Sequence, residues 1–442
     1  MSDSKLPRVL VIAEAANPQL TSVALIGYSL TRALLDVADV QLATELRNKD
    51  SILEAGFPAE RLIPVDNRRM QGMAFKVAKF LRGGESLGWT IYSAFYNVAY
   101  PVFERKLWRQ LEGPLKAREF DLVHRVTPLS PTTASPIAKR LQKIGVPLII
   151  GPLNGGVPWP VGFDAIRRQE REWLSYVRGL YRFTPDLQGT RDRAAALLLA
   201  SGHTYGEVVT TGERRRKAIY VPENAIDPER FPMPDKDRPA SDVLRLAFVG
   251  RLVPYKGAVT LLEAALPLLK KRCATLDIIG DGAEMGRLKE LVAENELEQV
   301  VTLPGWIAHE KLHARLREAD VFAFPSVREF GGGVVLEAMA LGLAPVVADY
   351  AGPTELVPDD CGWRVPFDSV ETLREGFTQK LTELAAQPAL VRETGARACD
   401  FVRAHFTWQA KAQQIRGVYD WALGRRERPE FAFAFNPEEM QA

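Results

Sequence analysis

Short apolar runs alternate with amphipathic stretches along the second half of the chain. Helices are predicted where apolar residues recur three and four positions apart, at 258–272, 285–297, 309–319 and 333–342. Buried strands are predicted where Val, Ile, Leu, Ala and Phe dominate, at 244–250, 275–280, 300–305, 320–326 and 344–349. Strands that alternate with helices form a parallel sheet covered on both faces. The pattern therefore predicts a Rossmann-like domain.

The first half follows the same rhythm less regularly. Strands are predicted at 8–14, 39–45, 120–126 and 146–152, with an early helix at 22–36. We therefore expect a second Rossmann-like domain, with ligands held at the carboxyl ends of the strands. A last helical stretch, 407–424, follows the completed second sheet and is expected to cross back to the first domain.

A proline-rich stretch, 231–242, separates the two halves and lacks apolar periodicity, which is typical of a linker. The predicted N-terminal domain consists of residues 1–235 and of the C-terminal helix at about 407–442. The predicted C-terminal domain is 242–406.

The composition of the 442 residues, 46% hydrophobic and 25% charged, is that of a globular protein and excludes wholesale disorder or a fibrous repeat. Three scattered cysteines, Cys273, Cys361 and Cys399, favour a reducing compartment over a disulfide framework. The first apolar run, Val9–Ala13, is too short for a signal peptide. Polar residues, prolines and glycines interrupt two uncharged stretches, 86–103 and 144–163, so neither predicts a membrane span. We expect a cytoplasmic protein.

The formal net charge of +2 conceals a division between the halves. Residues 1–240 hold 34 Lys and Arg against 26 Asp and Glu, a net charge of +8, whereas 241–442 hold 23 against 29, a net charge of −6. Opposite signs in one chain suggest that the two domains have different partners.

A glycine-rich turn, Gly331–Gly333, follows a predicted strand and opens a helix. Glycines let the backbone approach a ligand closely, and the N-terminus of a helix offers free N–H groups to a phosphate or diphosphate. Glu329 and Glu337 flank the turn, and a carboxylate can accept two hydrogen bonds from a sugar diol. The same residues could equally form a tight structural loop and a solvated helix position.

Two cations follow the strand 244–250, in the segment FVGRLVPYKG. Arg251 offers a bidentate fork and Lys256 a point charge, and together they suit a diphosphate leaving group. The alternative is a pair of solvated loop cations.

These motifs together resemble glycosyltransferase family 4, the retaining group with the GT-B fold. The resemblance rests on FVGRLVPYKG, the pair Glu329/Glu337 around FGGG, IIGDG at 278–282, LPGWI at 303–307, and the closing FTWQAKAQQIRGVYDWAL. It is strong over about 245–425 and weaker over the first half. It implies two Rossmann-like domains that face each other across a cleft.

The resemblance also implies roles for individual residues. Arg251 and Lys256 would hold the diphosphate, Glu329 the donor sugar and Glu337 the ribose. The remaining donor-binding residues would be Gly250, Ile307, Gly331, Gly332, Gly333 and Val334. DLVH at 121–124 matches a strand-end histidine of the family, so His124 would face the reacting sugar; a histidine satisfied within the protein is the alternative. The first strand–helix loop, EAANPQLTSVALIG, departs from the family because it lacks adjacent glycines.

The expected reaction moves a sugar from a nucleotide-diphosphate sugar to an acceptor hydroxyl with retention of the anomeric configuration. It is expected to need no cofactor and no metal. The pair Asp235/Asp237 lies in the linker and is interpreted as solvated rather than as a metal site. Alternatives are a hydrolase or epimerase of nucleotide sugars and a non-catalytic GT-B binding protein. No G-x-G-x-x-G follows the first strand, which disfavours a dehydrogenase, and no reader motif indicates nucleic-acid binding.

A basic segment, 68–110, has a net charge of +6 and encloses an aromatic-rich stretch; 167–183 repeats this chemistry. Such segments suit an anionic membrane surface, and with it a lipid-linked or polysaccharide acceptor in cell-surface glycan synthesis. The alternative is a helical hairpin that lines the cleft.

Overall fold

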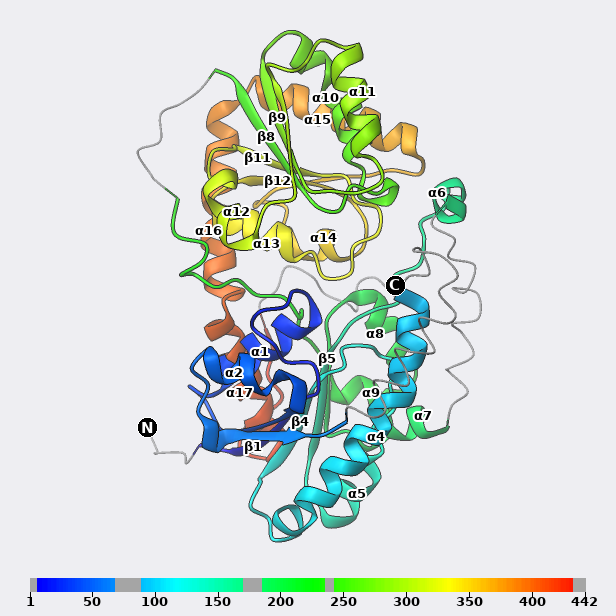
Figure 1. The fold of residues 1–442 in the computed structure, drawn as a ribbon, viewed down its shortest axis with the longest axis vertical. Helices are drawn as coiled ribbons and strands as arrows, with labels where there is room; N and C mark the ends of the chain where they lie inside the picture. The colour runs from blue at the N-terminus through cyan, green and yellow to red at the C-terminus, as the bar shows by residue number, and fades with distance from the viewer. Residues whose placement is uncertain (1–5, 68–88, 170–184, 235–241, 432–442) are drawn as a thin grey trace.

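The computed structural model describes residues 6–67, 89–169, 185–234 and 242–431 (Figure 1). It contains two parallel β-sheets, one in each half of the chain, and each sheet has helices on both faces. Residues 235–241 of the predicted linker, with Asp235 and Asp237, lie outside the described residues.

The N-terminal sheet has seven strands in the order β3-β2-β1-β4-β5-β6-β7, all parallel where the pairing is described. The strands are β1 (Arg8–Ala13), β2 (Asp39–Glu45), β3 (Leu62–Val65), β4 (Leu122–Thr127), β5 (Leu148–Leu153), β6 (Ala196–Leu199) and β7 (Ala218–Tyr220). The order reverses between β1 and β4, which makes this point of the carboxyl edge a natural place for a ligand.

The C-terminal sheet has six parallel strands in the order β10-β9-β8-β11-β12-β13. The strands are β8 (Leu244–Val249), β9 (Ala274–Ile279), β10 (Val301–Gly305), β11 (Val321–Phe324), β12 (Ala344–Ala348) and β13 (Trp363–Val365). Its order reverses between β8 and β11, so the loops after these two strands border the corresponding crevice.

Crossover helices connect the parallel strands, because a parallel pair cannot be joined by a tight turn. In the N-terminal half these are α1 (Val23–Leu34), α2 (Lys49–Glu54), α4 (Trp89–Lys116), α5 (Ile137–Ile144), α6 (Asp164–Gln169), α7 (Pro185–Arg193), α8 (Gly202–Val208) and α9 (Gly212–Lys217). In the C-terminal half they are α10 (Ala258–Lys270), α11 (Met285–Glu294), α12 (His309–Leu316), α13 (Gly333–Ala340) and α14 (Ala351–Leu356). Three further helices follow the last strand: α15 (Val370–Ala385), α16 (Pro388–His405) and α17 (Trp408–Ala422). Among the helices that the structure describes, none has the length and apolar character needed to cross a membrane.

Helix α17 packs against the N-terminal sheet, not the sheet that precedes it in sequence (Figure 1). Its buried face joins the core cluster that contains Leu30 and Leu34 of α1. Arg416 of α17 donates to the carbonyl oxygen of Val37 over 2.8 Å. The predicted crossing of the C-terminal helix is therefore confirmed.

Loops at the carboxyl ends of the two sheets meet each other. The Gly202 amide, after β6, donates to the Glu355 carboxylate of α14 over 2.9 Å, and Tyr220 of β7 donates to the same group. Trp159 of the N-terminal half packs edge-on against Tyr255 of the C-terminal half, with ring centres 5.9 Å apart. Both carboxyl edges therefore face the same region between the domains.

Candidate active site

A cavity of about 310 Å³ lies at the carboxyl ends of β8 and β11, the point where the strand order reverses. Its lining brings together six residues that the sequence had singled out, Gly250, Arg251, Lys256, Glu329, Val334 and Glu337. Val249, Leu312 and Phe324 complete the wall. Cations, carboxylates and backbone amides thus converge on one hollow.

A larger hollow, of about 440 Å³, lies elsewhere in the same domain. It is formed where α10 and α11 end, by residues such as Lys270, Arg272 and Glu294. None of the sequence motifs reaches it, so the smaller cavity is the better candidate for a functional site.

Lys256 and Glu329 form an ion pair in the cavity wall, with 13% and 19% of their side chains exposed. Lys256 ends a short 3₁₀ turn, Pro254–Lys256, and its ammonium lies 5.4 Å from the centre of the Phe324 ring. Arg251 is exposed and donates to the hydroxyl of Tyr255, which lies between the two cations in sequence. Both cations are thus anchored at the cavity but retain access to solvent.

The glycine turn begins helix α13, as the sequence predicts. Gly332 has a left-handed backbone with φ of 54°, and a Cβ there would lie 2.9 Å from Cδ1 of Leu356. A Cβ on Gly331 would lie only 1.8 Å from Oε1 of Glu223. A side chain at either position would therefore have to displace a neighbouring side chain, and at Gly332 it would also strain the backbone. The turn brings the N-terminus of α13 to the cavity.

Ile307 lies after β10, beyond β9 from the cavity, and it is not among the lining residues. Its side chain is half-buried against the core, whereas the neighbouring Trp306 is 74% exposed. The backbone of these two residues lies at the carboxyl end of β10, with β9 between it and the cavity.

His124 does not face the cavity, and here the expectation from the resemblance is wrong. Strand β4 continues to Thr127, so His124 lies within the strand, fully buried. Its Nε2 lies 2.7 Å from the carbonyl oxygen of Gly151, and its Nδ1 lies 2.7 Å from the hydroxyl of Tyr419 in α17. Burial lowers the pKa of His124 to about 4. The alternative, a histidine satisfied within the protein, is the one observed.

Because a carbonyl oxygen can only accept, Nε2 of the neutral His124 ring carries the proton, and the Tyr419 hydroxyl donates to Nδ1. Both ring nitrogens are occupied by protein groups. His124 therefore ties α17 to the sheet and has no free nitrogen for a substrate.

The carboxyl edge of the N-terminal sheet carries buried charges that the sequence analysis did not single out. Glu14, directly after β1, and Glu45, at the end of β2, both lie beside Arg47. Burial and repulsion from Glu45 raise the pKa of Glu14 well above its usual value. Arg125 of β4 is 1% exposed and donates to the carbonyl oxygen of Thr133. A charged residue at the end of an apolar run, as in VIAE, is the signal that could have drawn attention to Glu14.

No group of three or more His, Cys, Asp and Glu side chains is placed to hold a metal ion within the described ranges. The basic aromatic segments can be followed only in part, because 68–88 and 170–184 lie outside the described residues.

Comparisons with known proteins found a matching family model and several similar proteins. The family model for glycosyl transferases group 1 matches residues 231–392, which include the whole cavity lining. The chain is 34% identical over 244 residues to the putative colanic acid biosynthesis glycosyltransferase WcaL of Escherichia coli, covering 52% of this chain and 58% of that protein. It is 33% identical over 164 residues to the amylovoran biosynthesis glycosyltransferase AmsK of Erwinia amylovora, covering 35% and 40%. The chain thus spans about half the length of these curated relatives.

Among solved structures, sucrose-phosphate synthase from Thermosynechococcus elongatus aligns with a TM-score of 0.60 over 95% of this chain and all of that one, at 18% identity. This similarity confirms the predicted GT-B fold. The resemblance to group 1 glycosyltransferases is likewise confirmed, through the match over residues 231–392.

Proposed function

We propose that this protein, whose residues 231–392 form a glycosyl transferases group 1 domain, is a retaining glycosyltransferase that uses a nucleoside-diphosphate sugar. The observation that carries the proposal is the convergence of Arg251, Lys256, Glu329 and Glu337 on one cavity at the N-terminus of α13. The domain limits remain those proposed from the sequence, 1–235 with 407–442, and 242–406.

In this proposal the diphosphate lies between the two cations and the start of α13. Arg251 and Lys256 stabilise the negative charge that develops as the bond from the sugar to the diphosphate breaks. The amides of Gly332 to Val334 donate to phosphate oxygens, aided by the helix dipole. The protein itself supplies the positive charge that a divalent metal provides in other phosphate sites, so we propose turnover without a metal.

The carboxylates orient the donor. Glu329 accepts from hydroxyls of the transferred sugar, and Glu337, one turn into α13, accepts from the ribose diol. Lys256 pairs with Glu329 in the structure, and both groups are partly exposed. Because most of each side chain is already removed from water, exchange of this partner for a phosphate requires little further desolvation.

For the acceptor we propose a lipid-linked or polysaccharide hydroxyl in cell-surface glycan synthesis. The support is the description of two relatives as glycosyltransferases of colanic acid and amylovoran biosynthesis. The acceptor hydroxyl attacks the anomeric carbon from the face that the diphosphate leaves. The bond from the sugar to the diphosphate oxygen breaks, and the proton of the hydroxyl passes to the departing diphosphate.

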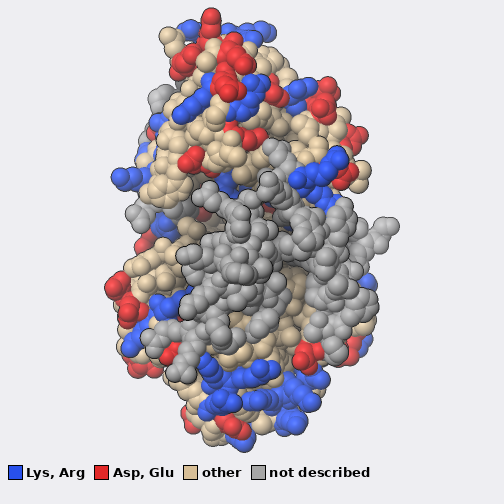
Figure 2. Space-filling view, turned by 45° about the vertical axis from the view of Figure 1, so that its right-hand side comes forward, with Lys and Arg blue, Asp and Glu red and all other residues tan. Residues whose placement is uncertain are grey.

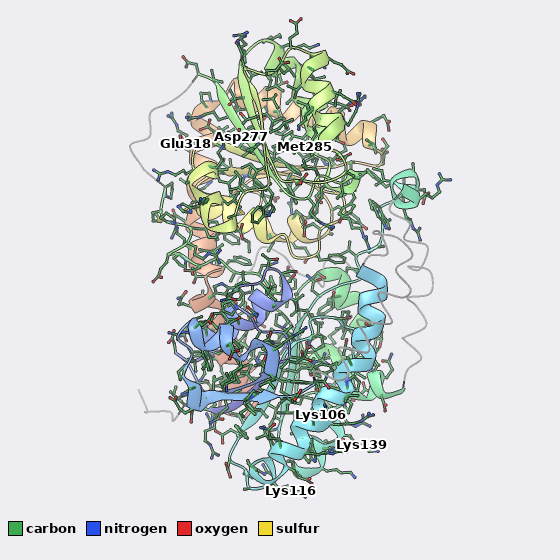
Figure 3. All side chains as sticks on the ribbon, in the orientation of Figure 1. Lys106, Lys116, Lys139, Asp277, Met285 and Glu318 are labelled. Carbon is green, nitrogen blue, oxygen red and sulfur yellow. The ribbon has the colours of Figure 1, made fainter. Side chains whose placement is uncertain are left out.

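We also propose that the N-terminal domain contacts an anionic membrane surface, from the cytoplasmic side. Part of the basic segment is described, on the C-terminal half of α4, and α5 packs beside it. Lys and Arg side chains gather at the lower end of the molecule (Figure 2). Lys106, Lys116 and Lys139 lie at this end of the domain, away from the cavity (Figure 3). The patch is completed by Arg105, Arg109, Arg118, Arg140 and Lys143. Rigid helices hold these charges, which favours binding to a charged surface.

The reaction is tested by incubating the protein with labelled UDP-, GDP- and ADP-sugars, with and without lipid-linked acceptors. Transfer to the acceptor, with the anomeric configuration of the product read by NMR, supports the proposal. Sugar release without acceptor identifies a hydrolase, and tight binding without turnover identifies a binding protein. Loss of turnover on chelation of divalent metals would contradict the metal-free mechanism.

Membrane contact is tested by co-sedimentation with vesicles of neutral lipid and of neutral lipid mixed with anionic lipid. Replacement of Lys139 and Lys143 by glutamate should reduce binding to anionic vesicles, whereas the same change at the exposed Lys270 and Lys271 of the other domain should not. Equal binding of the wild type to both kinds of vesicle would remove the membrane from the proposal.

A further inference from the structure

A buried carboxylate, Glu223, lies where the chain passes from the first domain to the second. It follows β7 and is 4% exposed. Its Oε2 is buried and has no hydrogen-bond partner among the described residues. A buried carboxylate with an unsatisfied oxygen lowers stability, so packing alone does not explain its presence.

The other oxygen of Glu223 touches both domains. Oε1 accepts a hydrogen bond of 2.6 Å from Nδ2 of Asn154, which follows β5 of the N-terminal sheet. The same Oε1 lies against Gly331 of the glycine turn, so closely that a Cβ at Gly331 would be 1.8 Å away. The next residue, Asn224, donates from Nδ2 to the carbonyl oxygen of Gly331 over 2.7 Å. Glu223 and Asn224 thus support the glycine turn from the side of the N-terminal domain.

Asn154 in turn holds a second glycine loop, Gly155–Gly156. Its Oδ1 accepts from the Gly155 amide over 2.8 Å and from the Ser201 hydroxyl over 3.0 Å. Gly155 and Gly156 both have positive φ, 144° and 86°, so this loop has a backbone that other residues rarely adopt. One carboxylate oxygen therefore joins a glycine loop of each domain.

We propose that Glu223 is a positioning residue that links the glycine turn of the donor site to the Asn154–Gly156 loop of the other domain. The link rests on the proposed function in that the turn holds a diphosphate. Because the contacts at Oε1 are short, a shift of Gly331 on diphosphate binding displaces the carboxylate, and Asn154 follows. Donor binding in one domain thereby orders the Asn154–Gly156 loop of the other.

The first test needs no ligand. Hydrogen exchange of peptides that span 328–336 and 153–160 is compared between the wild type and Glu223→Ala. Loss of the carboxylate leaves the turn with less support, so we expect exchange in 328–336 to rise about fivefold or more. Glu355→Ala is the matched control, because Glu355 also joins the domains while buried, but its hydrogen bonds go to Gly202 and Tyr220. Unchanged exchange in Glu223→Ala, or an equal rise in Glu355→Ala, would overturn the proposal.

The second test adds whichever of UDP, GDP and ADP raises the melting temperature of the wild type. We expect it to slow exchange in both peptides of the wild type. Asn154→Ala should keep the effect in 328–336 and lose it in 153–160, whereas Glu223→Gln, whose amide oxygen can still accept from Asn154, should keep both. Slowed exchange of 153–160 in Asn154→Ala would show that the link does not run through this pair. If none of the three nucleotides binds, the proposed donor site fails, and the ligand-free comparison still decides whether Glu223 supports the turn.

Discussion

Both sheets direct their carboxyl edges toward the other domain, but their charged residues are held in different ways. On the carboxyl edge of the C-terminal sheet, Lys256 and Glu329 form an ion pair in the wall of a cavity, and 13% and 19% of their side chains remain exposed. On the carboxyl edge of the N-terminal sheet, the side chains of Glu14 and Glu45 are 4% and 3% exposed and lie beside Arg47. His124, inside strand β4 of the same sheet, is fully buried.

The difference separates two uses of charge. A partly exposed ion pair can exchange a partner for a ligand because water already screens it. Buried charges have lost their hydration, and removal of one partner leaves the other unsatisfied. The carboxyl edge of the C-terminal sheet is thus suited to bind a charged donor. The carboxyl edge of the N-terminal sheet is suited to fix the geometry of its loops.

The largest effect is expected for Lys256, at the carboxyl edge of the C-terminal sheet. Lys256→Ala should lower kcat for sugar transfer by about 100- to 1000-fold, the usual loss when one group that stabilises developing charge is removed. Initial rates with a saturating donor measure it. Lys271→Ala, at an exposed position in the same domain, is the control. A loss below about tenfold would mean that Lys256 does not stabilise the leaving group.

The next prediction concerns how the buried His124 makes the free energy of unfolding depend on pH. The pKa of His124 is about 4 in the folded protein and about 6.5 when the ring is exposed. Between these values the unfolded chain binds more protons than the folded protein. The contribution of His124 to the free energy of unfolding is therefore fully present above pH 6.5 and falls by up to about 3 kcal/mol as the pH drops toward 4. Urea unfolding at several pH values should give a shallower pH dependence for His124→Gln than for the wild type. Identical slopes would mean that His124 titrates normally.

A smaller effect is expected at Glu337. Glu337→Gln should weaken donor binding about tenfold, or about 1.4 kcal/mol, because a neutral amide is a poorer acceptor for the ribose diol. Titration calorimetry with the nucleoside diphosphate measures the change, and Glu290→Gln on the exposed face of α11 is the comparison. Unchanged affinity would remove Glu337 from the ribose role.

The smallest effect concerns the helix that crosses between domains. Tyr419→Phe removes the hydroxyl that donates to Nδ1 of His124 and should lower the free energy of unfolding by about 1 kcal/mol. Donor affinity should stay the same, since α17 does not reach the cavity. Tyr28→Phe, whose hydroxyl makes one bond at the surface, should cost less. A donor affinity that changed with Tyr419 would show that the two edges are coupled through α17.

The sequence predicted the central strands of the C-terminal sheet well because they are largely buried and therefore form continuous apolar runs, such as 244–250 for β8 (Leu244–Val249). The edge strand β13, of three residues, was not predicted. The short strands β6 and β7, of four and three residues, escaped prediction because such runs do not differ from buried helix segments. Two prolines inside α4, Pro101 and Pro114, concealed that helix.

The site divides in the same way. Arg251, Lys256, Glu329 and Glu337 lie in two contiguous motifs that adjacent strands bring together, so pattern and strand order sufficed. The contact of Asn154 with Glu223 joins residues 69 positions apart in different domains, and no local pattern indicates it. The role of His124 came from the family resemblance and not from the predicted strand, 120–126, which ends within one residue of β4 (Leu122–Thr127) and already contains the histidine.

The position of α17 has a consequence for anyone who wishes to divide the protein. A cut in the proline-rich linker would produce an N-terminal fragment that lacks α17, and the faces of Leu30, Leu34 and Ile219 that now pack in its cluster would lie open to water. Such a fragment would be prone to self-association through that apolar strip. Joining residues 407–424 to the fragment through a short flexible linker would cover the strip again. The first domain is therefore best produced from two segments that are far apart in the sequence.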